Sequence, residues 1–238
     1  SGFDVIELSV PAGRLGGIDS PEYMAKLDSF AVWLREQPEV LNVQTLSDIV
    51  KKVNRNIHSD LIAYEKIPES KEQVAQYLLL YEMSLPRGIS LNDRITVSRE
   101  ASRVTIILGR DGRNLPSDEL LPVADRIEGW LKENGGAGMA ASATGLSLMF
   151  AHLSERNIEM MLGGTTIAIL LVSIILIVGL RSFQLSAISL VGDCVPALMA
   201  LGVWGHLVSE MNVAVSIVAA LTFGIVVDDT IHYLTKYA

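Results

Sequence analysis

Two adjacent carboxylates, Asp228 and Asp229, lie near the end of an otherwise apolar segment at residues 212–233. A charged side chain at the centre of a membrane helix costs about 2.5–3.5 kcal/mol on insertion scales. Two neighbouring acids in one such segment are therefore expected to face protein or a water path rather than lipid. The pair predicts a site that handles protons or ions.

A histidine follows the acid pair at helical spacing. His232 is four residues after Asp228 and three after Asp229, so both carboxylates can neighbour the imidazole along a helix. Carboxylates that share a poorly hydrated site titrate as a coupled pair, as a proton-driven machine requires. The alternative is that the pair, only four to five residues from the end of its segment, is hydrated at the membrane surface and has no such role.

A further acid, Asp193, lies in another apolar segment, three residues before Pro196. Proline removes a hydrogen bond from the helical ladder, and neighbouring groups must satisfy the freed carbonyl. Asp193 either does this or joins the acid cluster, and both interpretations stay open. His206 and Glu210 have i, i+4 spacing, but no third ligand lies near them, so we predict neither a metal nor a cofactor.

Three apolar segments are long enough to cross a membrane, at residues 161–180, 185–207 and 212–233. The links between them are short, which predicts antiparallel neighbours. Arg181 and Lys236 then lie on one side, and the rule that basic loops stay inside places them in the cytoplasm. Residues 1–159 are expected on the periplasmic or extracellular side.

Charge divides the chain in the same way. Two of the 19 basic and four of the 27 acidic residues follow Glu159, so residues 1–159 carry a net charge of −6. Such an acidic domain argues against nucleic acid and anionic lipid as partners. The single cysteine, Cys194, excludes an internal disulfide, and no nucleophile elbow, phosphate loop or HExxH motif indicates an enzyme. Without an initiator Met, the chain is expected to be part of a longer protein.

Residues 1–144 alternate between strand and helix patterns, which predicts an α+β domain with a ferredoxin-like βαβ–βαβ order. An insert at about 47–99, with two helices, separates the two halves, and a connecting helix at 145–160 leads into the first span. Ser20 with Pro21, and Ser117, are expected to begin the two core helices. The predicted strands are residues 4–10, 40–46, 103–108 and 138–143, and the insert helices are residues 48–58 and 71–83.

The run Gly-Ile-Val-Val-Asp-Asp-Thr-Ile-His-Tyr-Leu at residues 224–234 resembles the acidic transmembrane motif of resistance-nodulation-division (RND) exporters of the MMPL type. Matches to the same family run along nearly the whole chain. They are Gln-Tyr-Leu-Leu-Leu-Tyr-Glu at 76–82, Thr144-Gly145, Met149-Phe150, Leu180-Arg181-Ser182, Pro196-Ala197-Leu198 and Leu201-Gly202-Val203.

The resemblance implies export of lipids or other hydrophobic molecules driven by the proton-motive force, with the proton relay at Asp228 and Asp229. It implies a porter-like periplasmic domain followed by three transmembrane helices. The Asp-Asp-Thr-Ile-His form resembles that of the second half of such a transporter. The setting would be the cytoplasmic (inner) membrane of a bacterium or archaeon. The partners would be membrane lipids, the remaining half of the transporter and the hydrophobic substrate. Gly192-Asp193 departs from the family's usual Pro-Asn, which makes Asp193 a further relay candidate.

Two other classes of function fit the same features. A sterol-sensing-like protein would bind lipid in the membrane without pumping it. Alternatively, residues 1–159 would chiefly dock a periplasmic accessory protein. The insert could shape either a pocket or a partner surface.

Overall fold

The structure is a computed structural model that describes residues 3–136 and 138–180, together with residues 195, 198, 199, 202, 203, 206, 217 and 221. The chain divides into two compact units, Ser1–Ala151 and His152–Ala238. The first unit is an α+β domain built on a four-stranded antiparallel sheet, which confirms the predicted α+β class.

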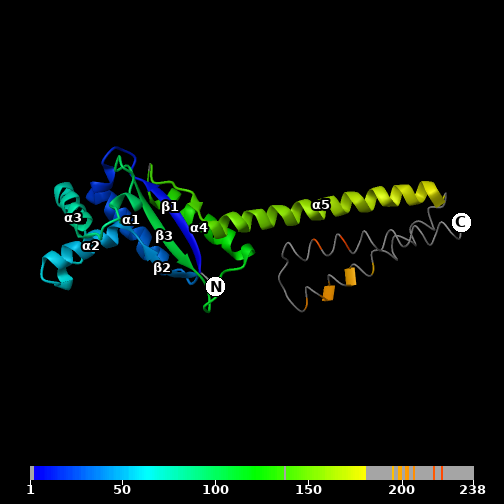
Figure 1. Ribbon diagram of the computed structural model, residues 1–238, viewed down its shortest axis with the longest axis horizontal. Coiled ribbons are helices and arrows are strands. Elements are labelled where there is room, and N and C mark those ends of the chain that lie inside the picture. Colours follow the sequence, from blue (N-terminus) through cyan, green and yellow to red (C-terminus); the bar gives the residue numbers. More distant parts are fainter. Residues whose placement is uncertain are drawn as a thin grey trace. The chain divides into compact units, whose positions relative to one another are not determined.

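The sheet has the strand order β2-β3-β1-β4 (Figure 1). Its two central strands pair along eight residues, from Asp4 opposite Leu108 to Pro11 opposite Ala101. The strands are β1 (Asp4–Pro11), β2 (Val40–Gln44), β3 (Ala101–Leu108) and β4 (Ala143–Thr144). The first three confirm predicted strands, whereas the strand predicted at 138–143 was wrong for all but its last residue.

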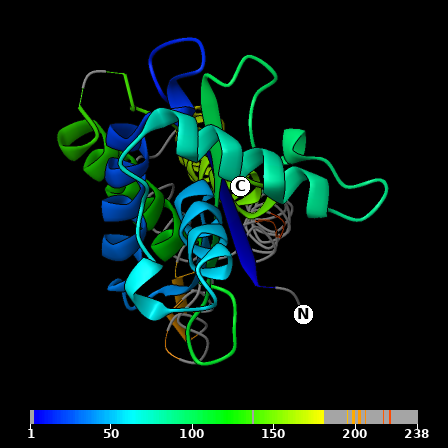
Figure 2. The ribbon, with the colours of Figure 1, turned by 90° about the vertical axis from the view of Figure 1, so that its left-hand side faces the viewer.

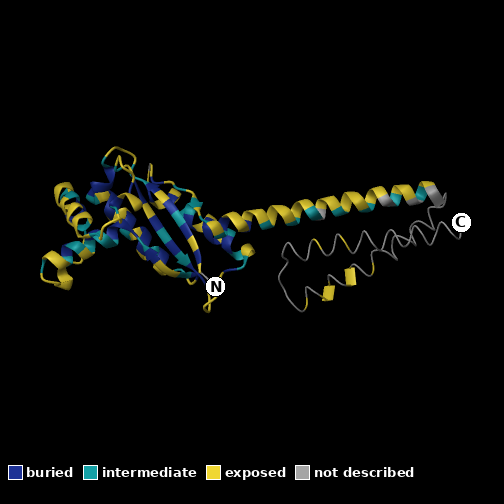
Figure 3. Cartoon of the chain, viewed as in Figure 1, coloured by how far each residue is buried: buried dark blue, intermediate teal, exposed yellow. Residues whose placement is uncertain are grey.

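One face of the sheet is buried, because side chains along a strand point alternately to its two faces. Figure 3 shows this alternation along the central strands. The buried side chains of β1 and β3 join one hydrophobic core with those of α1 (Pro21–Arg35) and α4 (Ser117–Asn134). Figure 2 shows both helices on the same side of β1. From β1 and β3, this core contains Ile6, Leu8, Val10, Val104, Ile106 and Leu108.

Both core helices form as predicted, apart from the first residue of α4. Ser20 is the N-cap of α1 with Pro21 in the first turn, although its side chain makes no capping hydrogen bond. Ser117 was predicted as the cap of α4 but is the first helical residue, after the extended Pro116. Trp130 is half-buried and stacks on Phe30 and Trp33, with ring centroids 5.2 and 5.4 Å away.

The insert folds as two helices, as predicted. A capping box formed by Thr45 and Asp48 begins α2 (Leu46–Ile57), and this ends β2 two residues earlier than expected. Asn54 is buried in α2, where its amide donates to the Lys66 carbonyl at 2.8 Å and accepts from Tyr77 Oη at 3.2 Å. The other elements are α3 (Lys71–Ser84) and the 3₁₀ turns η1 (Gly17–Asp19), η2 (Ile62–Tyr64) and η3 (Leu91–Asp93).

The predicted connecting helix and the first predicted span form one helix, α5 (Leu146–Leu180), which extends across both units. Residues 146–175 of α5 have a mean hydropathy of 2.1 in their most apolar window, and none of that window is buried. By length and composition, α5 is the one helix among the described residues that could cross a membrane. The second and third predicted spans lie outside the described residues, apart from isolated positions.

Tyr23 connects α1 to both central strands. Its hydroxyl donates to the Val10 carbonyl at 2.9 Å and lies 2.7 Å from Ser102 Oγ. Burial raises the pKa of Tyr23 to about 12, and the Ser102 hydrogen bonds oppose only part of that shift. The phenol is therefore held neutral and hydrogen-bonded inside the core.

We expect Tyr23→Phe to lower the free energy of unfolding of the domain by about 1 kcal/mol, because the Val10 carbonyl and the Ser102 hydroxyl lose a buried partner. Urea unfolding of the detergent-solubilised chain, followed by tryptophan fluorescence, measures this. Tyr81→Phe is the matched control, since the Tyr81 hydroxyl makes no hydrogen bond to the described part of the chain. Equal losses in the two variants would contradict the role of the Tyr23 hydroxyl.

Alkaline pH provides a second test of Tyr23. The unfolded chain releases the phenol proton near pH 10, whereas the folded domain holds it to about pH 12. Stability is therefore complete below pH 10 and falls as the pH rises toward 12, by up to roughly 2–3 kcal/mol from this group. The Tyr23→Phe variant should lose less stability over the same interval. Parallel pH curves for the two proteins would show that the shifted pKa does not contribute.

Candidate functional site

The predicted proton-relay residues Asp193, Asp228, Asp229 and His232 all lie outside the described residues. So does Glu210, while His206 is described and exposed. Within the described residues, the candidate sites are two surface cavities of the α+β domain, which lie on different elements.

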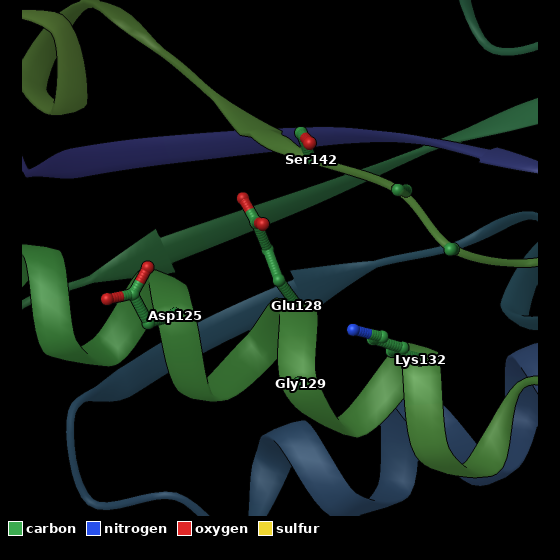
Figure 4. Close-up of a pocket in the computed structure, with 7 residues that line it drawn as sticks. Asp125, Glu128, Gly129, Lys132 and Ser142 are labelled. Atoms are coloured by element: carbon green, nitrogen blue, oxygen red, sulfur yellow. The ribbon is translucent and has the colours of Figure 1, made fainter.

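The first cavity, of about 350 Å³, lies between α4 and the segment that leads into β4 (Figure 4). Asp125, Glu128 and Lys132 project from α4 at i, i+3 and i+4 spacing, which places them on one side of the helix. Gly129 lies among them, and the space where its Cβ would be is open. The opposite wall is formed by Ala140, Ala141 and Ser142.

Glu128 makes a structural contact across this cavity. Figure 4 shows its carboxylate directed toward the β4 segment, and the backbone N–H of Ala143 donates to Oε1 at 2.6 Å. A hydrogen bond to an ionised acceptor is stronger than a neutral one. Glu128 therefore holds the sheet's short edge strand against α4.

The preceding residues explain why β4 is so short. Gly136 and Gly138 have positive φ angles of 79° and 104°, which are incompatible with a β-ladder. Residues 140–142 lie outside the strand, which begins at Ala143. The ladder can begin only at Ala143, where Glu128 satisfies the N–H that faces α4.

The second cavity, of about 490 Å³, lies along β1, β3 and the loop at residues 92–97. Its charged groups are largely paired. Arg103 Nη1 lies 3.6 Å from Glu7 Oε1, and Arg94 donates to Gln44 Oε1 at 3.1 Å. Serine and threonine hydroxyls and backbone groups complete a polar surface that can hydrogen-bond a ligand but carries little net charge.

No His or Cys lines either cavity. Across residues 3–136 and 138–180, no cluster of three or more His, Cys, Asp or Glu side chains could hold a metal ion. Sequence reasoning missed the Glu128 contact. The only available signal was an acid on the polar side of the α4 stripe, which is also the pattern of an ordinary solvated face.

Comparison with known proteins gave no relatives. No protein-family model, no curated protein and no solved structure matches the chain.

We expect Glu128→Ala to speed hydrogen exchange at the Ala143 amide about fivefold, since loss of a partly exposed, charge-assisted hydrogen bond costs about 1 kcal/mol. Exchange measured by NMR or mass spectrometry checks this. Asp125→Ala is the matched control on the same helix, because Asp125 makes no hydrogen bond or ion pair to the described chain. Comparable acceleration in both variants would contradict an anchoring role for Glu128.

Proposed function

We propose that the chain is part of an RND/MMPL-type membrane transporter that exports lipids or other hydrophobic molecules, driven by the proton-motive force. The observation that carries the proposal is the acid pair Asp228-Asp229, with His232 one turn on, within an apolar segment of membrane-spanning length. Asp193, in the adjacent apolar segment, is the further member of the proposed relay.

The fold supports the proposal in two ways. The order β1-α1-β2, insert, β3-α4-β4, with strands arranged β2-β3-β1-β4, fits the ferredoxin-like arrangement expected for a porter-like domain. In addition, the apolar window of α5 is unburied, unlike that of a core helix in a soluble protein. Such a surface suits lipid as its solvent.

In the proposed mechanism, protons bind to and leave Asp228 and Asp229, and this alters the packing of the transmembrane helices. Leu148 and Ala151 in the first two turns of α5 are buried in the core of the α+β domain. Because α5 is one unbroken helix, a shift of its membrane part would be carried into that domain. The domain itself would bind or guide substrate and perform no covalent chemistry.

The proposal places the chain in the cytoplasmic membrane of a bacterium or archaeon, with residues 1–159 on the outer side. Its partners would be membrane lipids, the other half of the transporter and the hydrophobic substrate. A periplasmic accessory protein would be a further partner, and it would bind on the polar surface around the cavities of the domain.

The test is export of a fluorescent long-chain lipid by cells carrying the full-length protein. We expect the double variant Asp228→Asn, Asp229→Asn to lose at least about tenfold in rate, because the amides cannot take up and release protons. Glu210→Gln, in the link between the second and third segments, should retain export and is the matched control. Undiminished, still proton-dependent export in the double variant would contradict the proposal. Lipid binding that is insensitive to pH and ionophores, without export, would indicate a sterol-sensing-like protein.

A further inference from the structure

Two arginines of the second cavity lie directly opposite each other. The backbone N–H of Arg103 donates to the Arg94 carbonyl at 2.7 Å, and the bridge between Ile95 and Ser102 continues the same antiparallel register. Opposite residues of an antiparallel pair project from the same face, with Cβ atoms about 4.5–5.5 Å apart. Arg94 and Arg103 both line the cavity, so the two side chains face the same space.

The arginine pair belongs to a row of hydrogen-bond donors that crosses the sheet. Ser9 of β1 is opposite Arg103 of β3, and both line the cavity. The row therefore runs from Ser9 through Arg103 to Arg94 and presents one hydroxyl beside two guanidinium groups. Ser9 and Arg103 are exposed, whereas their neighbours along β1 and β3 are buried. The row thus lies on the face of the sheet opposite the hydrophobic core.

The adjacent row contacts both arginines but leaves most of their donors available. Glu7 and Gln44 flank Thr105 in this row. Arg94 Nη2 donates to Gln44 Oε1 at 3.1 Å. Arg103 Nη1 lies 3.6 Å from Glu7 Oε1, which is an ion-pair distance but too long for a hydrogen bond. Each guanidinium group carries five N–H donors, so most donors of both groups remain for a ligand.

The two acids of the cavity do not neutralise the arginine pair as a unit. Like charges directly opposite each other in a sheet are destabilising. Glu7 pairs with Arg103, and Asp93 takes part in the capping box that begins η3. Within the described residues, no carboxylate forms an ion pair with Arg94. An anion bound between the two guanidinium groups would therefore remove a repulsion that the folded domain leaves in place.

We propose that this cavity binds the phosphate of an amphipathic molecule's headgroup between Arg94 and Arg103, with the Ser9 hydroxyl as a further donor. Guanidinium groups bind phosphate through pairs of parallel hydrogen bonds. A phosphate has more oxygens than a carboxylate, and two guanidinium groups with a hydroxyl need those additional acceptors. The cavity, of about 490 Å³, is larger than a phosphate and leaves room for its substituent.

The remaining lining determines which part of the molecule enters. Asn92, Thr96 and Thr144 also line the cavity. Covering such polar side chains with an acyl chain would cost free energy, because they would lose hydrogen bonds to water. The site therefore takes the headgroup and not the chain. That this headgroup belongs to the exported molecule rests on the proposed function, whereas the phosphate site itself does not.

The test is binding of sn-glycero-3-phosphoglycerol, a deacylated phospholipid headgroup, to the detergent-solubilised full-length protein, measured by isothermal titration calorimetry. We expect Arg94→Gln and Arg103→Gln each to weaken binding at least about tenfold, since each removes charged donors to the phosphate. Arg113→Gln, in the turn after β3 and outside the cavity, is the matched control and should leave binding unchanged. Equal weakening in all three variants, or no binding by the unmodified protein, would overturn the proposal.

Glu7→Gln should change the affinity in the opposite direction, which a loss of folding cannot imitate. Removal of the carboxylate 3.6 Å from Arg103 removes its repulsion of the phosphate, and binding should tighten about threefold. Unchanged or weaker binding would overturn the assignment of the phosphate to Arg103.

Two further comparisons separate the ligand from the function. Inorganic phosphate is expected to bind at least about tenfold more weakly than the headgroup, because it makes no contact beyond the arginines and Ser9. Equal affinities would overturn the headgroup assignment. These titrations need no proton gradient, so they do not depend on Asp228 and Asp229. A protein that binds the headgroup through both arginines but does not export would contradict the proposed function alone.

Discussion

The pairing of β1 with β3 is the interaction on which the rest of the domain depends. It joins residues about a hundred positions apart, from Asp4 with Leu108 to Pro11 with Ala101. The two outer strands each pair with one member of this central pair, and the core helices pack on the face that it creates. Ordering so long an intervening chain costs entropy, which burial of the aligned Ile, Leu and Val side chains offsets.

Polar contacts connect further elements of the domain to one another. Tyr23 ties α1 to both central strands, Asn54 joins the two insert helices, and Glu128 holds the edge strand. Each is a hydrogen bond between two different elements of the domain. The insert and the edge strand are thus attached to the core by a few specific side chains.

The helix α5 gives the molecule its second organising feature. One side of its first turns belongs to the domain core, and its later turns are apolar throughout. Under the proposed function, this continuity is what would connect proton binding in the membrane to movement outside it.

Much of the fold was predictable because the spacing of apolar residues along the sequence differs between strands and helices. The alternation in β1, and the Pro21 start and apolar stripe of α1, identified both elements. The edge strand was not predictable in the same way. A run of small residues at 138–143 has no strong period, and Gly138 within it has a positive φ of 104°, which does not fit a β-ladder. The early end of β2 depended on a capping box, where a local helix signal competed with a strand pattern.

The sequence by itself determined the separation of a charged domain from apolar segments and the acid pair within the last of these. These are properties of composition and of residues a few positions apart. Only the tertiary structure decided the strand order, the Glu128 contact and which side of the first turns of α5 joins the domain core. All three depend on contacts between different elements, which the pattern of neighbouring residues does not specify.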